Sequence, residues 1–426
     1  MLLKTDDIIK TETNNDNDMI RILQISDIHF KRLPDAKDEY TQLKERLYEK
    51  MEEIVKDSRI DCILICGDVA FSGNPDEYEQ KAKVFINRLC DITQCEAAQV
   101  YMVPGNHDKN RNAEYNHTRT LLRESMLKSD EGYKHFSDLY LDENDVYSKW
   151  LVPFKAYITF ANEYRCVSDS VASTKAGKKK GLTDKFYWED KMNVGPYTLR
   201  LHGINSCYVS DWDDDNHNQV LPQELYNATK NKNVVNVSVM HHPLEFVKDA
   251  DSVKQEMDRL YQVQFYGHIH KQTIENNGAL KIYSGAIMPP KNEGKGEEGY
   301  EPVFNIIEFK EGNGVVFVTV KPYQWEWKSK DDGMFIALKE EGPFEMVVDS
   351  ASAKTAEQGK VLKMPKGINQ RRVEVDFLQS GRTDEIISQM YEGFEFSDDA
   401  VADSSTFFER VRKDDRYVDL YNYIHE

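Results

Sequence analysis

The sequence predicts a mixed α/β (α+β) fold, and three observations support this prediction. Between residues 19 and 103, strand-like apolar runs alternate with helical periods in the order β-α-β-α-β. From residue 186 to 320, several strand-like runs follow one another without an intervening helix, which favours antiparallel pairing in the second half. The 426 residues are 40% hydrophobic and 11% aromatic, so the chain has enough apolar side chains for a sizeable core.

The alternation in the first hundred residues can be followed element by element. Residues 19–30 form the first predicted strand and residues 39–55 carry apolar side chains at helical spacing. Residues 60–66 are a nearly continuous apolar run, typical of a strand buried on both faces. A second helix over 77–89 and a third strand over 99–103 follow. Each strand ends in polar residues, and ligand sites of open α/β sheets lie at such carboxyl ends.

Residues 109–196 interrupt this alternation and predict a cap or insertion. Amphipathic helical patterns occupy residues 121–128, 133–141 and 147–164. Residues 168–180 are small, polar and basic, which indicates a loop. Strand-like runs then resume over residues 186–191, 197–208, 234–240, 263–266, 280–283, 303–309 and 315–320.

The C-terminal part of the chain differs in composition from the rest. Residues 371–426 hold seven basic and 14 acidic residues, with helical patterns over 383–391 and 406–424. The aromatic residues Phe407, Phe408, Tyr417, Tyr421 and Tyr423 predict either packing or a surface for a homo-oligomer or protein partner. The predicted organisation is a flexible N-terminal segment (1–18), a main domain (19–330), a linker region (331–370) and an acidic C-terminal helical module (371–426).

Charge and cysteine content narrow the classes of function. With 55 Lys and Arg against 74 Asp and Glu, the net charge of −19 disfavours nucleic acid as a partner without excluding it. Six Cys without a CxxC pair predict neither a disulfide framework nor a zinc ribbon. The sequence has no apolar stretch of about 18 residues and no signal-peptide core at its start, so we expect a cytoplasmic protein without a membrane partner.

Five clusters of polar residues carry the candidate chemistry, and each follows a predicted strand. They contain six of the 11 His residues. In chain order they are Asp27-x-His29, Gly67-Asp68, Gly105-Asn106-His107-Asp108, His241-His242-Pro243 and Gly267-His268-Ile269-His270.

A single cluster of this kind has an ordinary structural explanation, because an isolated Asp at a strand end commonly caps a helix or forms a turn. Five such ends in succession need another explanation, since unpaired Asp and His side chains are costly to bury. In an extended chain, Asp27 and His29 would project from the same face, about 6.6 Å apart along the strand. His268 and His270 share this spacing.

The clusters supply seven candidate metal ligands, which are too many for one ion and suit two. Asp68, central in the set, is the natural bridge between them. Two adjacent cations lower the pKa of a shared water and clamp the oxygens of an in-line displacement at phosphorus. Mixed nitrogen and oxygen ligation fits two divalent ions of Mn, Fe, Zn, Co or Ni, with Mn expected to serve in vitro. The seven ligands are Asp27, His29, Asp68, Asn106, His241, His268 and His270.

In this order, the clusters resemble the motif set of the calcineurin-like metallophosphoesterases. The resemblance spans about residues 19–320 and implies a four-layer β-sandwich flanked by helices, with the site at one edge. It implies that one metal is held by Asp27, His29, Asp68 and His270. It implies that the other is held by Asp68, Asn106, His241 and His268.

The resemblance also implies roles for residues beside the ligands. His107 would be the non-ligand His that protonates the leaving oxygen, and Asp108 would orient it. Asn106, His107 and His242 are the expected substrate-binding residues. His242 has no ligand role in the family and is expected to be a pocket or structural residue.

The residues after Asp68 indicate which branch of the family the chain resembles most. Protein Ser/Thr phosphatases carry GDxVDRG and GNHE, whereas this chain reads GDVAFSG and GNHD. Break-repair nucleases usually show a second acidic residue or His soon after GD, and Val69, Ala70 and Phe71 supply none. Residues 67–78 are most similar to the class III cyclic-nucleotide phosphodiesterase branch.

We therefore expect a dinuclear metal-dependent phosphodiesterase that acts on a nucleotide-type substrate. A metal-dependent DNA or RNA nuclease is the alternative, with Lys175 and the lysines at 178–180 as a basic lip. A further alternative is a scaffold that retains the phosphoesterase fold and docks a partner. The presence of all seven ligands and of His107 disfavours the scaffold.

Overall fold

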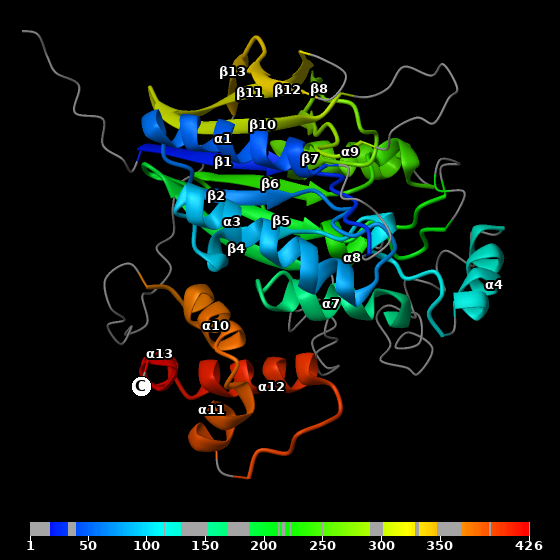
Figure 1. Ribbon diagram of the computed structural model, residues 1–426, viewed down its shortest axis with the longest axis vertical. Coiled ribbons are helices and arrows are strands. Elements are labelled where there is room, and N and C mark those ends of the chain that lie inside the picture. The colour runs from blue at the N-terminus through cyan, green and yellow to red at the C-terminus, as the bar shows by residue number, and fades with distance from the viewer. Residues whose placement is uncertain are drawn as a thin grey trace, which may run out of the picture.

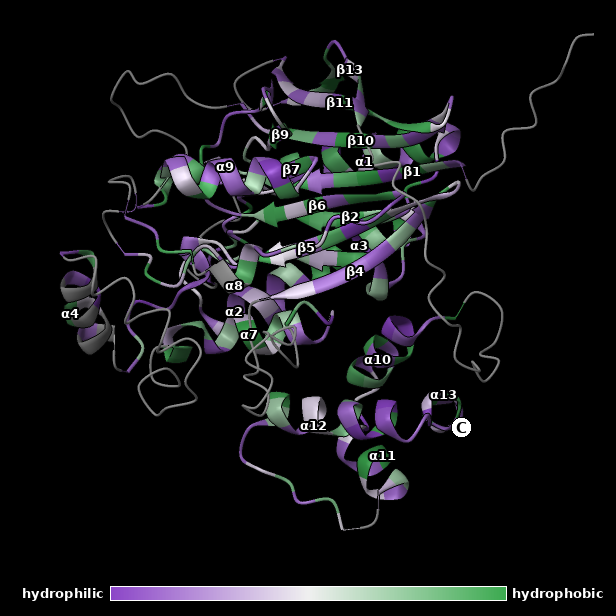
Figure 2. Ribbon diagram, turned by 180° about the vertical axis from the view of Figure 1, so that it is seen from behind, coloured by the Kyte–Doolittle hydropathy of each residue, from purple (hydrophilic) through white to green (hydrophobic). Residues whose placement is uncertain are grey.

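The strands of the protein form two sheets, and helices lie on the outer side of each. The computed structural model describes residues 18–32, 40–114, 116–128, 151–167, 187–211, 214, 218–221, 223–248, 250–289, 301–328, 332–346, 368–391 and 393–425. Figure 1 shows α1 (Thr41–Asp57) and α3 (Lys83–Thr93) in front of β1 and β2. From behind, α9 (Ala250–Leu260) lies in front of β7 (Figure 2). The predicted mixed α/β fold is confirmed.

The first sheet joins the beginning of the main domain to its end. Its order is β12-β11-β10-β1-β2-β3, with β13 also paired to β11. β1, β2 and β3 are parallel, whereas β10 runs antiparallel to β1 and β11 runs antiparallel to β10. The strands are β1 (Met19–Ile25), β2 (Cys62–Ile65), β3 (Val100–Met102), β10 (Val303–Gly312), β11 (Val315–Trp327), β12 (Gly333–Ala337) and β13 (Glu341–Met346).

The second sheet has the order β4-β5-β6-β7-β9-β8. Its four central strands are parallel, and β4 and β8 pair antiparallel at the two edges. The second half is more antiparallel than the first, as expected, because β4, β8, β10 and β11 all pair antiparallel. The centre of this sheet is parallel because α9, a helix that the sequence pattern did not reveal, returns the chain from β6 to a parallel β7. The strands are β4 (Trp188–Val194), β5 (Tyr197–Ile204), β6 (Val234–Met240), β7 (Val263–Tyr266), β8 (Thr273–Asn276) and β9 (Leu280–Tyr283).

The predicted helices of the first hundred residues pack through one apolar face. In α1, Leu43, Leu47 and Met51 are buried at a spacing of four residues. Asn74 caps the short helix α2 (Pro75–Glu77), and a π-helical turn, η2 (Tyr78–Ala82), leads from it into α3. Among the helices of the described ranges, none is both long and apolar enough to cross a membrane.

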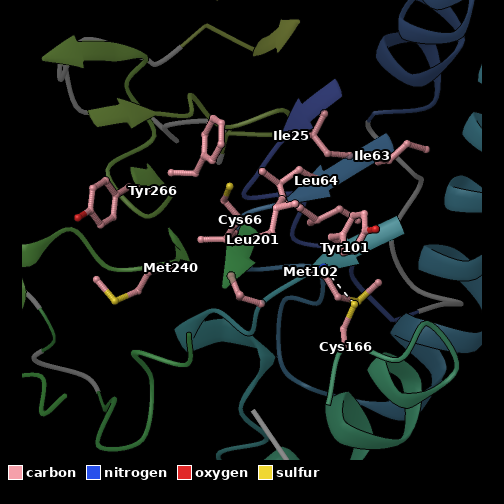
Figure 3. Close-up of a cluster of buried hydrophobic side chains, with 14 of the residues drawn as sticks. Ile25, Ile63, Leu64, Cys66, Tyr101, Met102, Cys166, Leu201, Met240 and Tyr266 are labelled. Carbon is pink, nitrogen blue, oxygen red and sulfur yellow. Dashed lines mark hydrogen bonds between the residues drawn. The ribbon is translucent and has the colours of Figure 1, made fainter. Parts of the chain in front are cut away.

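The hydrophobic core lies between the two sheets. Ile25 and Leu64 of the first sheet share one buried cluster with Leu201 and Met240 of the second (Figure 3). All four side chains are fully buried. This packing fixes the two sheets relative to each other, and therefore also fixes the strand ends that carry the polar clusters.

Two boundaries of the predicted organisation differ from the structure. β12 and β13 lie within the predicted linker 331–370, and both pair with β11. β13 is mostly exposed and contains Pro343, so it lacks the apolar alternation that marks a strand. β4 lies within the predicted insertion 109–196 but belongs to the second sheet. Its charged, exposed centre, purple in Figure 2, is typical of an edge strand.

The predicted insertion contains helices, as expected. α4 (Asn116–Leu127) and α7 (Lys155–Asn162) are its described helices, and a 3₁₀ turn, Val152–Phe154, precedes α7 at Pro153. The predicted helix over 133–141 and the predicted loop over 168–180 lie outside the described residues, as do residues 1–17 and 347–367.

The C-terminal module is a group of four helices with a core of its own (Figure 1). The helix predicted over 383–391 is confirmed, and the pattern over 406–424 divides into two helices around Asp415, which has φ 56°. Phe407, Phe408 and Tyr417 are buried in the core of the module, so their aromatic face is used for internal packing. The helices are α10 (Gln370–Gln379), α11 (Thr383–Met390), α12 (Ala400–Lys413) and α13 (Tyr417–His425).

Arg371 of α10 attaches this module to the free edge of the first sheet. Its guanidinium donates to the carbonyl oxygens of Ala98 (2.8 Å), Val100 (3.1 Å) and Tyr164 (2.6 Å). The same group lies 4.4 Å from the centre of the Tyr101 ring. Because β3 is the edge strand, this contact satisfies backbone acceptors that an uncovered edge would leave open.

Candidate metal centre

All five polar clusters meet at one edge of the β-sandwich. They follow β1, β2, β3, β6 and β7, whose parallel carboxyl ends point to the same side in each sheet. The predicted ligands form overlapping groups whose donor atoms lie within 4.8 Å of one another. The groups are Asp27, His29 and His270; Asp27, Asp68 and His241; His29, Asp68 and His107; and His241, His242 and His268.

The backbone at the ligands is left-handed, which contradicts the expected extended geometry of the Asp-x-His and His-x-His pairs. The Asp27 N–H donates to the Gly67 carbonyl (3.1 Å), and the His29 N–H donates to the Asp68 carbonyl (3.0 Å), so the segment curls while staying bonded to its neighbour. Left-handed residues other than Gly cost of order 1 kcal/mol or more each and cluster at functional sites. The residues are Asp27 (φ 53°), His29 (53°), Asp68 (53°), His268 (71°) and His270 (57°).

Two glycines of the motifs are needed because the ligands approach the backbone closely. Gly67 has φ +95°, and a Cβ there would lie 2.4 Å from Nδ1 of His241. A Cβ on Gly105 would lie 2.0 Å from Oδ1 of Asp68. Any side chain at either position would displace a ligand.

The first predicted metal position is bounded by Asp27, His29 and His270. The distance from His270 Nε2 to Asp27 Oδ1 is 3.3 Å, and that from His29 Nε2 to His270 Nε2 is 3.4 Å. His29 Nε2 lies 3.7 Å from Oδ2 of Asp68, which joins this group to the second one.

The second predicted position is bounded by Asp68, Asn106 and His241, with His268 beside them. His241 Nε2 lies 3.0 Å from Asn106 Oδ1 and 3.4 Å from Asp68 Oδ2. The rings of His241 and His268 have centroids 5.2 Å apart. Asp68 Oδ2 therefore faces ligands of both groups, as expected of the bridging residue.

These donors fit a pair of divalent cations. When the distance from metal to ligand is about 2.1 Å, neighbouring ligand atoms around one ion lie about 3.0–3.4 Å apart, and the distances above are close to this spacing. Nδ1 of His29 is buried without a hydrogen-bond partner, and the buried Oδ1 of Asp27 faces the imidazoles of His270 at 3.3 Å and His29 at 4.0 Å. A buried carboxylate oxygen is costly unless it is paired or coordinated, so the site has the chemistry of a metal-binding cradle.

Opposing charges set the protonation of the ligands. Burial opposes ionisation of Asp27, but His270 outweighs it and lowers the pKa of Asp27 to about 2. Burial also opposes ionisation of Asp68, yet the neighbouring His241 holds its pKa well below the usual value. Burial lowers the pKa of His29 to about 4. For His241, burial is outweighed by Asp68, which raises its pKa to about 9. At neutral pH both carboxylates are therefore anions, and His29 is a neutral imidazole.

A backbone carbonyl orients His241. Nδ1 of His241 lies 2.8 Å from the carbonyl oxygen of Cys66, which accepts its N–H. With Nδ1 bonded in this way, Nε2 of His241 points toward Asp68 and Asn106. An imidazole that binds a metal usually has its other nitrogen hydrogen-bonded in the same manner. Sequence reasoning could not identify Cys66 in this role, because the group involved is main-chain.

His107 lies at the site, and one of the groups above joins it to His29 and Asp68. Its backbone N–H donates to Asp68 Oδ1 (2.7 Å), and its ring centroid is 4.7 Å from that of His29. Nδ1 of His107 lies 2.9 Å from the carbonyl oxygen of Phe71. When Phe71 accepts the Nδ1 proton, Nε2 is the nitrogen available to the substrate.

Asp108 does not orient His107, which corrects the expected role. Its carboxylate accepts from the backbone N–H groups of Ala70 (2.9 Å) and Gly105 (2.8 Å) and from the hydroxyl of Tyr78 (2.8 Å). It therefore ties the loop after β2 to the loop after β3. Burial, followed by the charge of Asp68, raises the pKa of Asp108 to about 7.

His242 is fully buried, so its side chain is not accessible to a substrate. Of the two expected roles, pocket residue or structural residue, the burial favours the structural one. Ser206 Oγ accepts the His242 backbone N–H (3.0 Å) and lies 2.9 Å from its Nδ1. The His242 ring is 4.5 Å from that of His268, centroid to centroid. His242 thus packs directly behind a predicted ligand.

Comparisons with known proteins agree with this geometry. The family described as calcineurin-like phosphoesterase matches residues 20–272. A metallophosphoesterase-like protein of uncharacterised function, YydB of Bacillus subtilis (strain 168), is 26% identical over 329 residues. That match covers 72% of this chain and 60% of the relative, so the chain spans only about three fifths of the relative's length.

Solved structures that match the chain include a Vps29 mutant from Entamoeba histolytica (TM-score 0.30, 11% identity, covering 75% of this chain and 98% of that one). Purple acid phosphatase PPD1 from yellow lupin (Lupinus luteus) seeds has a TM-score of 0.36 at 12% identity, covering 72% of this chain and 51% of that one. The assignment rests on the family match, which includes all five motif clusters and spans more than half of the chain. The chain belongs to the calcineurin-like phosphoesterase family.

Proposed function

We propose that the protein is a dinuclear metal-dependent phosphodiesterase that acts on a nucleotide-type substrate. The observation that carries this proposal is the position of Asp68, whose Oδ2 lies within 3.7 Å of His29 Nε2 and 3.4 Å of His241 Nε2. One carboxylate thus faces both groups of ligands. Two bound divalent cations supply a shared water of lowered pKa and a clamp on the attacking and leaving oxygens.

The residues of the chain hold the two cations and supply the proton for the leaving group. Asp27, His29 and His270 hold one cation with Asp68, and Asn106, His241 and His268 hold the other with Asp68. His107 is held at Nδ1 by the Phe71 carbonyl, so Nε2 can carry the proton for the leaving oxygen.

The loop after Asp68 favours a diester over a monoester. Ser72 stands at the position of the Arg in GDxVDRG, so this position offers no cation to a second negative charge on the phosphate. A phosphodiester carries a single negative charge and needs less compensation.

A substrate panel with added Mn²⁺ tests the proposal. It compares bis-p-nitrophenyl phosphate, p-nitrophenyl phosphate, a cyclic mononucleotide, single-stranded DNA and RNA, with Asp68→Asn as the inactive control. Faster hydrolysis of the diester and the cyclic nucleotide supports the proposal. Preferential cleavage of DNA or RNA that falls steeply with added salt would instead establish the nuclease.

The same panel separates catalysis from docking. A chain that binds two metal ions yet hydrolyses none of the substrates would contradict the phosphodiesterase and favour the scaffold. The lysines that were expected to form a basic lip, Lys175 and those at 178–180, lie outside the described residues. A homo-oligomer or protein partner bound through the C-terminal module remains a prediction that light scattering can check.

A further inference from the structure

An exposed aromatic ring stands beside the proton donor of the proposed reaction. Phe71 is 43% exposed, although Val69 and Ala70 immediately before it are fully buried. The centroid of its ring lies 5.4 Å from that of His107 and 6.2 Å from that of His29. Single exposed apolar residues are ordinary on protein surfaces, but this one borders the metal centre.

The backbone of Phe71 is fixed on both sides. Its N–H donates to the carbonyl of Phe30 (3.0 Å), and its own carbonyl oxygen lies 2.9 Å from Nδ1 of His107. The side chain therefore projects from a segment whose position is coupled to the proton donor. A ring held in this way loses little conformational freedom when a ligand packs against it.

A cation accompanies the exposed ring. Nζ of Lys31 lies 5.1 Å from the centroid of Phe71, within the range of a cation–π contact. An exposed aromatic face beside a lysine offers stacking to a planar group and positive charge to its electronegative atoms. The same combination is used where proteins bind bases of single-stranded nucleic acid.

We propose that Phe71 and Lys31 form a subsite for a planar aromatic group on the leaving-group side of a phosphodiester. The inference rests on the proposed function, because it places the leaving oxygen beside Nε2 of His107. The group attached to that oxygen then lies next to the Phe71 ring. The chemical class that fits is a leaving group with a nucleobase or another flat aromatic ring, and Phe71 determines specificity for it.

The kinetic test compares two methyl phosphodiesters whose leaving groups have matched acidity, one an aryl group and the other a fluorinated alkyl group. Phe71→Ala and Phe71→Leu should each lower the aryl-to-alkyl ratio of kcat/KM about tenfold, since stacking on an aromatic side chain is typically worth that much. Phe71→Trp should keep or raise the ratio. Phe396→Ala is the matched control, because Phe396 is 45% exposed and lies in the C-terminal module.

Each kinetic outcome has a distinct meaning. If Phe71→Ala lowers both rates equally, the residue only supports His107 and the subsite is wrong. If Phe71→Leu keeps the aryl preference, apolar volume is sufficient and stacking is wrong. Metal content and circular dichroism of every variant exclude a loss of metal or of fold as the cause.

A binding measurement separates this inference from the proposed function. Calorimetry with the metal-loaded chain compares adenosine monophosphate with ribose 5-phosphate, which has the phosphate without the base. We expect adenosine monophosphate to bind about tenfold more tightly, and Phe71→Ala to remove that difference. Equal binding of the two probes to the unsubstituted chain would overturn the subsite whether or not the chain hydrolyses diesters. An absence of diester hydrolysis, with the difference in binding intact, would overturn only the proposed function.

Discussion

Glu374 of α10 forms a buried ion pair with Arg165, which follows α7, at 2.7 Å between Oε2 and Nε. Each side chain is 7% exposed. Oε1 of Glu374 also accepts from the hydroxyl of Tyr417, and the Arg165 guanidinium lies 4.7 Å from the centre of the Phe408 ring. This ion pair therefore anchors the acidic C-terminal module to the main domain. Each of the two charges would be costly to bury without the other.

Removal of one partner from this pair should be strongly destabilising. Glu374→Ala removes the buried ion pair of Arg165, and the loss of one member of a buried pair typically costs about 3–5 kcal/mol. Chemical denaturation of the full chain measures the free energy of unfolding. Glu385→Ala, which breaks an ion pair with Arg382 at the surface of the module, is the control and should change stability little. Equal effects of the two substitutions would show that the buried pair is not the anchor.

Deletion of residues 371–426 should destabilise the main domain more than it impairs catalysis. The deletion removes Arg371 from the edge of β3 and exposes Tyr101, so we expect a lower Tm and more aggregation. All seven predicted ligands lie between residues 27 and 270. Hydrolysis of a small artificial diester by the folded fraction should stay within about tenfold, or about 1.4 kcal/mol in the barrier. A well-folded truncated chain with a far larger loss would place the module at the active site.

Asp68→Asn should lower the metal content more than substitution of any ligand that serves a single ion. The carboxylate faces His29 and His241, and its other oxygen accepts the His107 N–H, so the amide weakens both metal positions together. Changes outside the ligand set typically cost about 10–100-fold in metal affinity, and loss of the bridge should exceed this. Elemental analysis after reconstitution gives the stoichiometry, with Asp76→Asn at the surface as the control. Two ions retained by Asp68→Asn would contradict the bridging role.

The sequence predicted well which side chains would meet at one place, because the predicted ligands are side chains at strand ends. Strands such as β2 are fully apolar and buried, so their ends are visible in the sequence, and the structure brings all seven ligands and His107 together there. The backbone geometry was predicted wrongly for the same ligands. The left-handed turns at Asp27 and His268 depend on contacts with residues distant in the sequence. The Asp27 N–H donates to the Gly67 carbonyl and the His268 N–H donates to the Asp27 carboxylate, and a local pattern contains neither contact.

Roles that depend on main-chain groups or on tertiary contacts could not be predicted. The backbone carbonyls of Cys66 and Phe71 orient the imidazoles of His241 and His107. The side chains of Cys66 and Phe71 give no indication of this role. The family resemblance implied that Asp108 would orient His107, but the fold directs its carboxylate toward Tyr78. The strand β13 was missed because an exposed edge strand needs no apolar alternation.

Metal binding should release protons at neutral pH. In the metal-free chain, Asp68 raises the pKa of His241 to about 9, so this imidazole is charged at pH 7 and must lose its proton to become a ligand. Metal affinity should therefore rise with pH up to about 9. Asp27 and His29, with pKa values of about 2 and 4, are already deprotonated at pH 7 and release nothing. Calorimetry in two buffers of different ionisation enthalpy counts the protons, and binding without release between pH 6 and 8 would contradict this assignment.

The interaction of His241 with Asp68 also predicts how the stability of the metal-free chain depends on pH. The pKa of His241 is higher in the folded chain than its ordinary value of 6.5, so its protonation stabilises the fold. This contribution is fully present below pH 6.5 and is lost as the pH rises toward 9. Thermal unfolding with chelator should therefore show a falling Tm over that range. Added metal should reverse the trend, because binding then favours the deprotonated ring.

The role of His107 can be isolated through the leaving group. Because the Phe71 carbonyl holds Nδ1, we expect Nε2 to deliver a proton to the leaving oxygen, a contribution typically worth about 10²–10⁴-fold. An alkoxide needs this proton and p-nitrophenolate does not. His107→Ala should therefore reduce hydrolysis of a diester with an alkyl leaving group by that factor and reduce hydrolysis of bis-p-nitrophenyl phosphate only mildly. Metal content should be retained, since the contact of His107 with Asp68 is through its backbone N–H, which the substitution leaves in place. Equal losses on the two substrates would assign His107 to binding of the phosphate, and a loss of metal would make it a ligand.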